Sequence, residues 1–124
     1  MRVAVDAMGG DHAPDEIVRG SLMALEKDPE LNLLMVGDEE TVRTSLAACD
    51  CGENGRVEVR HASQIIEMGE SPVEALRRKP DSSIQRCVEA LRDGEVDAML
   101  SAGDTGGVVA AATLFIPRLK GVKR

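Results

Sequence analysis

The stretch L-N-L-L-M-V-G at Leu31–Gly37 restricts the fold more than any other part of the chain. A nearly continuous apolar run of this length is typical of a strand that is buried on both faces, as in a parallel sheet. Asp38 follows directly and can cap a helix that continues to about Ala48. Because a buried strand is followed at once by a capped helix, we expect an α/β fold with parallel strands.

Strand and helix signals alternate on both sides of this unit. Further strands are predicted at about residues 3–5, 57–59 and 96–100, the second of them with the polar alternation of an edge strand. Further helices are predicted at about residues 14–27, 72–79, 83–93 and 105–116. This order implies right-handed βαβ crossovers. The predicted fold class is therefore α/β, a three-layer α/β/α arrangement around a mostly parallel sheet.

Three of the predicted helices begin with recognisable signals. Pro14 suits the first position of a helix, where its missing N–H needs no partner. The sequence S-P-V-E at Ser71–Glu74 has the form of a capping box, and the short helix that it opens carries Arg77–Lys79 at its end. Asp81–Ser83 supplies the cap of the helix that follows.

The composition excludes several classes of function. The chain has 124 residues, of which 43% are hydrophobic, and this suits one compact domain. Its net charge is −7 and Phe115 is its only aromatic residue, so we expect no nucleic-acid partner. No apolar run approaches the length of a membrane span, and the N-terminal segment at residues 1–10 is too short and too acidic for a signal peptide. We therefore expect a cytoplasmic location.

Charge is distributed unevenly along the chain. Residues 1–70 contain 15 acidic and 6 basic side chains, whereas residues 71–124 contain 7 acidic and 9 basic ones. Basic residues gather at Arg77–Lys79 and again at residues 118–124. An anion site is expected to draw on the second half, although a solvated basic face is the favoured explanation of the C-terminal group.

The cysteines and histidines do not form a catalytic or metal-binding pattern. Cys49, Cys51 and Cys87 are odd in number and include no C-x-x-C pair, and His12 and His61 lie far apart in the sequence. We therefore expect free thiols in a reducing compartment, no metal site and no Ser-His-Asp triad.

Two glycine-rich segments follow predicted strands. They are D-A-M-G-G-D-H at Asp6–His12 and S-A-G-D-T-G-G at Ser101–Gly107. Ligands of parallel sheets bind beyond the carboxyl ends of the strands, where free N–H groups at helix starts can hold an anion. Neither segment matches a known phosphate-loop or dinucleotide motif, so tight turns would explain each of them alone about as well. Their presence at two matching strand ends predicts an anion site.

The motifs together resemble the PlsX-type phosphate acyltransferases. The resemblance rests on V-D-A-M-G-G-D-H-A-P at Val5–Pro14, R-R-K at Arg77–Lys79, S-A-G-D-T-G-G at Ser101–Gly107 and L-F-I at Leu114–Ile116, in the family's order along the whole chain. It implies a fold like that of isopropylmalate dehydrogenases and phosphotransacetylases. Family members continue far beyond position 124, so residues 1–124 are expected to be the N-terminal α/β portion of a larger acyltransferase.

The resemblance also implies an activity and partners. The family forms acyl-phosphate from acyl-[acyl carrier protein] and inorganic phosphate, early in bacterial phospholipid synthesis, and needs no metal or organic cofactor. Its members are homodimers in the cytoplasm that associate peripherally with the inner face of the membrane, near a downstream acyltransferase. Two alternatives stay open: a phosphotransacetylase-like enzyme that acts on coenzyme A thioesters, and a non-catalytic phosphate-binding or dimerisation module.

Site residues are carried over onto matching positions. Lys79 and Arg78 are expected to neutralise charge, and His12 is a candidate polar group in catalysis. The expected phosphate or acyl-phosphate contacts are Asp6, Gly9, Gly10, Asp11, Ser101, Gly103, Asp104, Thr105 and Gly106. Structural roles compete with these: Asp6 can cap a turn and His12 can serve as a helix-entry residue. The basic triplet can form an exposed helix end or a docking patch for an acidic carrier protein.

Position 104 departs from the family pattern. Asp104 stands where the family typically has Asn, and Gly107 replaces the usual Ala. An ionised Asp only accepts hydrogen bonds and would repel an anion, whereas an Asn can donate one. The same carboxylate can instead cap the following helix, so its role is either at the ligand or at the cap.

Overall fold

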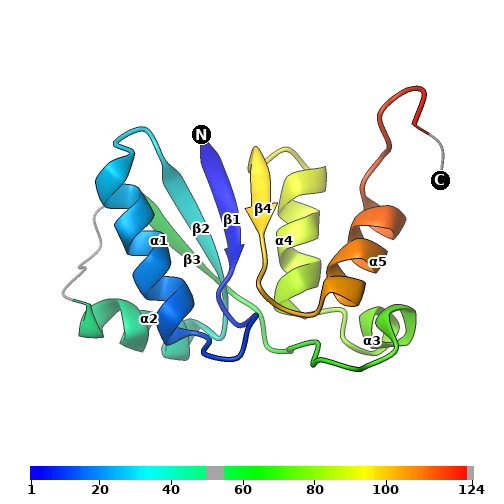
Figure 1. The fold of residues 1–124 in the computed structure, drawn as a ribbon, viewed down its shortest axis with the longest axis horizontal. Coiled ribbons are helices and arrows are strands. Elements are labelled where there is room, and N and C mark those ends of the chain that lie inside the picture. Colours follow the sequence, from blue (N-terminus) through cyan, green and yellow to red (C-terminus); the bar gives the residue numbers. More distant parts are fainter. Residues whose placement is uncertain (50–54, 123–124) are drawn as a thin grey trace.

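Residues 1–49 and 55–122 are described by a computed structural model, shown in Figure 1. Within these ranges four strands form one sheet, in the order β3-β2-β1-β4, and every pairing is parallel. The strands are β1 (Arg2–Asp6), β2 (Asn32–Gly37), β3 (Val57–His61) and β4 (Ala98–Leu100). The predicted parallel sheet is confirmed, with the 57–61 strand at one edge. Cys51, Lys123 and Arg124 lie outside the described residues.

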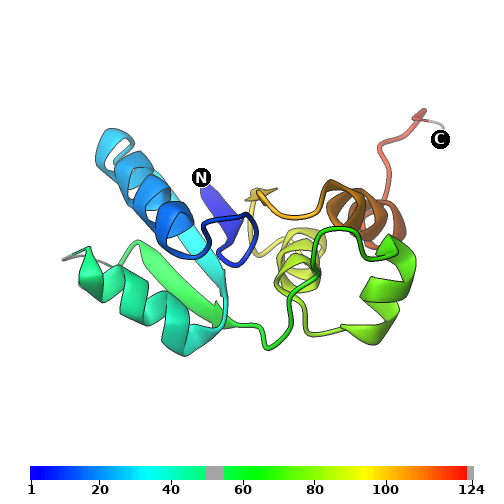
Figure 2. The same cartoon turned by 60° about the horizontal axis from the view of Figure 1, so that its bottom comes forward.

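Helices cover both faces of the sheet. They are α1 (Asp15–Lys27), α2 (Glu39–Ala48), α3 (Pro72–Arg78), α4 (Ser83–Arg92) and α5 (Thr105–Phe115). Figure 2 shows α1 and α2 on one side of the strands and α3, α4 and α5 on the other. The expected three-layer α/β/α arrangement is therefore confirmed for this part of the chain. None of the described helices is long and apolar enough to cross a membrane.

The core lies on both sides of the central strands. Met35 of β2 packs in the cluster under α1 and α2, whereas Leu34 and Val36 of the same strand pack with Cys87 of α4. All three β2 side chains are completely buried. This two-sided burial explains why the run at residues 31–37 is continuously apolar rather than alternating.

Two of the predicted helix caps are confirmed. The Asp38 carboxylate accepts a hydrogen bond from the Thr41 N–H at 3.0 Å and caps α2. The Ser82 hydroxyl accepts one from the Gln85 N–H at 3.1 Å and caps α4, which Gly94 ends with a φ of +74°. Both helices thus begin at the residues that their sequences indicate.

The other two predicted helix starts need correction. Ser71 occupies the cap position of α3, but its side chain makes no capping hydrogen bond, so the capping box is wrong. Glu74, the acidic member of that motif, pairs with Arg78 instead, with 2.9 Å between carboxylate and guanidinium. Pro14 lies one residue before α1 rather than at its first position, because the helix begins at Asp15.

The order of the strands reverses direction at one point of the sheet. The chain builds β1, β2 and β3 outward in one direction and then returns to add β4 on the other side of β1. The direction of winding therefore reverses between β1 and β4. In open parallel sheets this reversal, at the carboxyl ends of the two strands, is where a crevice for ligands forms.

Candidate functional site

The two glycine-rich segments meet at this reversal point. Gly9, in the loop after β1, lies against Gly103, in the loop after β4: a Cβ atom added at Gly9 would come within 2.7 Å of the Gly103 nitrogen. A side chain at position 9 would therefore push the loops apart. The expectation that the two segments lie at neighbouring strand ends is confirmed.

A buried carboxylate ties the two loops together. Asp6, at the end of β1, is 1% exposed, and its Oδ2 accepts a hydrogen bond from the Ser101 hydroxyl at 2.6 Å. Its Oδ1 accepts one from the Met8 N–H at 3.1 Å, which closes the turn after the strand. Asp6 therefore caps its turn, as one of the two interpretations held, and also fixes the second loop.

Ser101 is fully engaged by this arrangement. Its hydroxyl gives its single proton to Asp6 and accepts a hydrogen bond from the Gly103 N–H at 3.1 Å. The donor that a phosphate would need is therefore already used. In this structure the hydrogen bonds of Ser101 and Asp6 hold the two loops in place.

Asp104 acts as the cap of α5. Its Oδ2 accepts a hydrogen bond from the Gly107 N–H at 2.6 Å, and its carbonyl accepts one from Val108 at 3.1 Å. The capping interpretation of this departure from the family pattern is confirmed.

Open donors remain at the start of α5. Thr105 and Gly106 are exposed, and no hydrogen bond to either N–H is found within the described part of the chain. The Thr105 hydroxyl is likewise without a hydrogen-bond partner among the described residues. Two helix N–H groups and a hydroxyl are therefore available to an anion at this end of the sheet.

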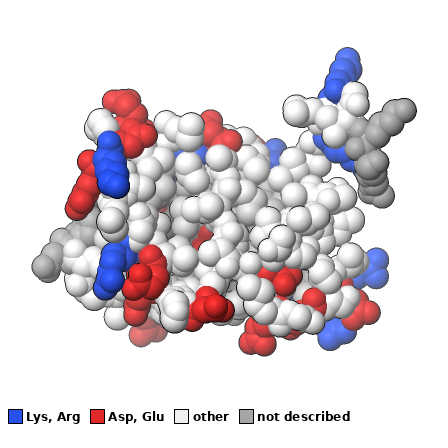
Figure 3. Space-filling view, viewed as in Figure 1, with Lys and Arg blue, Asp and Glu red and all other residues white. Residues whose placement is uncertain are grey.

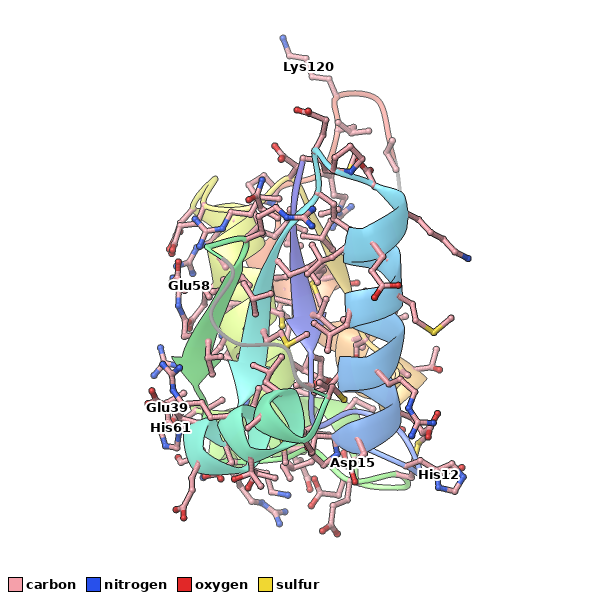
Figure 4. All side chains as sticks on the ribbon, turned by 90° about the vertical axis from the view of Figure 1, so that its left-hand side faces the viewer. His12, Asp15, Glu39, Glu58, His61 and Lys120 are labelled. Carbon is pink, nitrogen blue, oxygen red and sulfur yellow. The ribbon has the colours of Figure 1, made fainter. Side chains whose placement is uncertain are left out.

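The first loop offers backbone donors rather than side chains. Gly10 has a φ of +114°, which favours glycine and turns the chain toward Ala102 of the second loop. Asp11 and His12 are exposed, and the His12 carbonyl accepts a hydrogen bond from the Glu16 N–H at 3.2 Å. Figure 4 shows the His12 ring pointing away from the fold beyond the start of α1. This placement agrees with a helix-entry role for His12.

Lys79 forms its hydrogen bonds with residues outside the two glycine-rich loops. Its Nζ donates to the Ile65 carbonyl at 2.6 Å and to the Glu70 carboxylate at 2.8 Å, and this hydrogen bond lowers the pKa of Glu70. The ammonium group thereby fastens the loop between β3 and α3. No hydrogen bond or ion pair joins Lys79 to either glycine-rich loop among the described residues.

The sequence did not reveal which end of α3 faces the site. α3 meets the start of α5 at Pro72: a Cβ atom added at Gly106 would lie 2.9 Å from the Pro72 Cγ. Arg78 lies at the opposite end of this seven-residue helix, about 10 Å along its axis, and is exposed and paired with Glu74. Pro72 is therefore a neighbour of the site that sequence reasoning missed, and Arg78 and Lys79 are not brought to it.

Acidic side chains surround this end of the sheet. Figure 3 shows them along the lower edge of the molecule, where the strands end. Asp15, at the start of α1, accepts a hydrogen bond from Ser45 of α2. Among the described residues no three His, Cys, Asp or Glu side chains lie close enough together to hold a metal ion. The donors that the described residues offer to an anion here are the N–H groups at the start of α5 and the Thr105 hydroxyl.

The fold and the site define a doubly wound α/β protein whose candidate ligand site lies between β1 and β4. Its chain belongs to the fatty acid synthesis protein family, whose family model matches residues 1–124. The resemblance drawn from the motifs is thereby confirmed.

Several relatives carry the name phosphate acyltransferase. The protein of Pelotomaculum thermopropionicum is 48% identical over 124 residues, which are 100% of this chain and 35% of that protein. The protein of Halorhodospira halophila is 44% identical over 122 residues, 98% of this chain and 36% of that protein. That of Thermoanaerobacter pseudethanolicus is 45% identical over 124 residues, 100% of this chain and 36% of that protein. The chain thus spans about a third of the length of these relatives.

Proposed function

We propose that this chain is the phosphate-holding portion of an enzyme that makes acyl-phosphate from acyl-[acyl carrier protein] and inorganic phosphate in bacterial phospholipid synthesis. The observation that carries this proposal is the meeting of two glycine-rich loops at the reversal point, beside the free N–H groups of Thr105 and Gly106. The name of the relatives, phosphate acyltransferase, supports the same chemistry.

The reaction transfers an acyl group from sulfur to oxygen. A phosphate oxygen attacks the thioester carbonyl, the new C–O bond forms and the C–S bond breaks. The carrier's thiolate leaves and takes up the proton that the hydrogen phosphate loses. The protein must hold phosphate against the carbonyl and stabilise the oxyanion that develops on it. No step of this scheme uses a metal ion or an organic cofactor.

The residues at the two loops divide these tasks. We assign phosphate contact to the N–H groups of Thr105 and Gly106, to the Thr105 hydroxyl, and to the N–H groups of Gly10 and Asp11. The Asp6–Ser101 hydrogen bond keeps the loops at their present spacing.

The basic end of α3 has a different proposed role. Arg77 and Arg78 are exposed in its last turn, away from the loops, and suit the docking of an acidic carrier protein. Arg77→Glu should weaken carrier binding, with a smaller salt dependence, and leave phosphate binding unchanged. A loss of turnover with unchanged carrier binding would instead indicate that these side chains act in catalysis.

Assembly and location are proposed from family membership. The whole protein is proposed to be a cytoplasmic homodimer that associates peripherally with the inner face of the membrane, where a downstream acyltransferase uses its product. Size measurement by light scattering tests the dimer, and co-sedimentation with phospholipid vesicles tests the membrane association.

A second candidate is a non-catalytic phosphate-binding or dimerisation module. It is favoured by one observation, that the open N–H groups of Thr105 and Gly106 can hold phosphate without any acyl-transfer step. A phosphotransacetylase-like enzyme would use the same site chemistry with coenzyme A thioesters instead of carrier-protein thioesters.

Acyl-phosphate formation in two matched proteins separates these candidates. One is the 124-residue chain and the other is a chimera, in which the chain is continued by the segment that follows the aligned part of the Pelotomaculum relative. We expect turnover of carrier-protein thioester and phosphate by the chimera alone. Turnover only with coenzyme A thioester would favour the phosphotransacetylase alternative. No turnover by the chimera, with the intact relative active, would overturn the assignment.

A further inference from the structure

The loop between β3 and α3, at residues 62–71, leads the chain to the start of α5 at two points. Ile66 is buried, and a Cβ atom added at Gly107 would lie 3.4 Å from its Cγ2 atom. Pro72, directly after the loop, lies against Gly106, as described above. In Figure 2 this loop, drawn in green, crosses from the end of β3 past α4 to α3, which packs beside α5. The loop and the residue after it therefore contact the turn of α5 that carries the open N–H groups.

The first part of this loop is fastened by the residues that open α4. The Gln64 N–H donates to the Asp81 carbonyl at 3.1 Å, and the Gln64 carbonyl accepts a hydrogen bond from the Ser83 N–H at 3.1 Å. The Ser63 hydroxyl donates to the Asp81 carboxylate at 2.6 Å. These hydrogen bonds end at Gln64 and do not reach residues 65–70.

Residues 65–70 are fastened by Lys79. Within residues 1–49 and 55–122, the hydrogen bonds found between this segment and the rest of the chain are the three of the Lys79 Nζ. They go to the Ile65 carbonyl at 2.6 Å and to the two Glu70 carboxylate oxygens at 2.8 Å and 3.1 Å. An ammonium group has three donors, so all of them are used. The Lys79 side chain is 26% exposed, against 75% for the neighbouring Arg78, so its ion pair is better shielded from water than an ordinary surface pair.

The two attachment points of Lys79 lie next to the two residues that contact α5. Ile65 directly precedes Ile66, and Glu70 lies two residues before Pro72. We call the hydrogen bonds from the Lys79 Nζ to Ile65 and Glu70 the Lys79 clasp. Because the clasp holds the segment at both ends, its loss should allow Ile66 and Pro72 to move away from the first turn of α5.

We propose that Lys79 is a positioning residue for the phosphate site, and that the Lys79 clasp keeps the first turn of α5 in the geometry that an anion needs. The proposal rests on the proposed function, because it concerns the N–H groups of Thr105 and Gly106 that were assigned to phosphate contact. Lys79 acts through the loop and does not touch the ligand. Since Glu70 is its partner in the clasp, loss of either side chain should have the same effect on the site.

The direction of the change in phosphate affinity tests this role. The affinity of the 124-residue chain for inorganic phosphate is measured by NMR titration. Lys79→Met keeps an unbranched apolar side chain and removes the ammonium group, and it should weaken binding at least ~5-fold, as expected for coupling between distinct sites. Glu70→Ala should weaken binding by a similar factor, although it removes a negative charge. If Lys79 itself neutralised the phosphate, Glu70→Ala would free its ammonium group and tighten binding instead.

The double variant and amide exchange separate positioning from a general loss of stability. Lys79→Met combined with Glu70→Ala should bind phosphate no more than ~2-fold more weakly than either single variant, because both substitutions remove the same clasp. The Gly107 amide, which the Asp104 carboxylate accepts at 2.6 Å, should exchange ~5-fold faster in all three variants. The amides of Leu33–Val36 in β2 should change less than ~2-fold.

Arg92→Met is the matched control. It also removes a cation from an ion pair, the one with Asp93 at 2.7 Å, but at the other end of α4. We expect the phosphate affinity of this variant to change less than ~2-fold. A loss equal to that of Lys79→Met would attribute the effect to the lower positive charge of the chain and would overturn the proposal.

Three further outcomes would overturn the proposal. One is tighter phosphate binding by Glu70→Ala, which would make Lys79 a ligand of the anion. Another is an unchanged affinity in both single variants while the unaltered chain binds phosphate, which would leave the proposed function standing. The third is the absence of saturable binding by the unaltered chain, which would overturn the proposed phosphate site as well. Should Lys79→Met fail to fold, Glu70→Ala alone gives the direction of the change.

Discussion

The Ser101 hydroxyl donates a hydrogen bond of 2.6 Å to the Asp6 carboxylate across a sequence separation of 95 residues. This contact joins the ends of β1 and β4 and sets the spacing of the two loops. Asp6 is buried, and the partners found for it in the described chain, the Ser101 hydroxyl and the Met8 N–H, are neutral. Because a buried carboxylate is costly without its hydrogen bonds, the two loops depend on each other.

Removal of the Ser101 hydroxyl should therefore destabilise the chain. Ser101→Ala leaves one buried oxygen of Asp6 without a donor, and we expect the free energy of unfolding to fall by about 1–3 kcal/mol in urea denaturation. Asp6→Asn and the double variant complete a mutant cycle. If the effects of the two substitutions on the free energy of unfolding were additive, the Asp6–Ser101 hydrogen bond would not couple the two loops.

The close approach of the loops predicts a strict requirement for glycine at position 9. Gly9→Ala would place a Cβ atom 2.6 Å from the Asp6 carboxylate and 2.7 Å from the Gly103 nitrogen. We expect a loss of about 1–3 kcal/mol in unfolding free energy, since the backbone must move. Gly20→Ala is the control: its Cβ atom would meet no other atom within 4 Å, and within α1 it should stabilise by about 0.5–1 kcal/mol. Equal effects of the two substitutions would contradict the described contact.

Substitutions of Asp104 should affect the stability of the chain and its affinity for an anion separately. Asp104→Ala should cost about 1 kcal/mol, because the Gly107 N–H loses its acceptor. Asp104→Asn keeps an acceptor and removes a negative charge near the open N–H groups, so stability should change little while the affinity for inorganic phosphate rises. Denaturation and calorimetric titration measure the two effects. An unchanged phosphate affinity in Asp104→Asn would mean that the ligand does not approach this end of α5.

Asp81 predicts a pH dependence of stability. The hydrogen bonds from Ser63, followed by the one from Arg86, lower the pKa of Asp81 from 3.8 to about 2. A carboxylate whose pKa is lowered on folding stabilises the fold above the unfolded value of 3.8, and this contribution is lost as the pH falls toward 2. Because the pair is partly exposed, Asp81→Asn should cost about 1 kcal/mol at pH 7.

The difference in the free energy of unfolding between Asp81→Asn and the unaltered chain should narrow as the pH falls from about 4 to about 2. Urea denaturation at a series of pH values measures it, and Asp11→Asn, at an exposed position, provides the baseline. A difference that stays constant down to pH 2 would show that the charge of Asp81 contributes nothing.

The two described cysteines should differ in reactivity. Cys87 is completely buried in α4, and burial raises the pKa of its thiol well above the usual range, whereas Cys49 is exposed at the end of α2. Only the thiolate reacts with iodoacetamide. At pH 8 we expect Cys49 to be alkylated at least ~100-fold faster than Cys87, as followed by peptide mass spectrometry. Rapid labelling of Cys87 in native buffer would contradict the packing of α4 on the sheet.

Local signals in the sequence predicted most of the fold. The apolar run at Leu31–Gly37 became a central strand, and Asp38 and Ser82 cap the helices that they precede. The capping box at Ser71 did not form: the Ser71 side chain makes no capping hydrogen bond, and Glu74 pairs with Arg78. A capping motif shows which hydrogen bonds are available but not which of them form.

The contacts of the site depend on the fold as a whole. Two loops at neighbouring strand ends could be expected from the β–α alternation, but the pairing of Ser101 with Asp6 joins residues that no local pattern connects. Likewise, the family resemblance suggested Lys79 as a charge-neutralising group, whereas the structure pairs it with Glu70. The spacing of residues along a chain does not reveal which end of a short helix faces a crevice.

A titration with inorganic phosphate, followed by NMR of the ¹⁵N-labelled chain, tests the central claim most directly. We predict that the amide signals of Gly10 in the first loop and of Thr105 and Gly106, which begin α5 after the second loop, move together along one saturating curve, and that Gly9→Ala removes this response. Amide shifts confined to one loop, or to the basic end of α3 at residues 77–79, would contradict the claim that both loops hold the same anion.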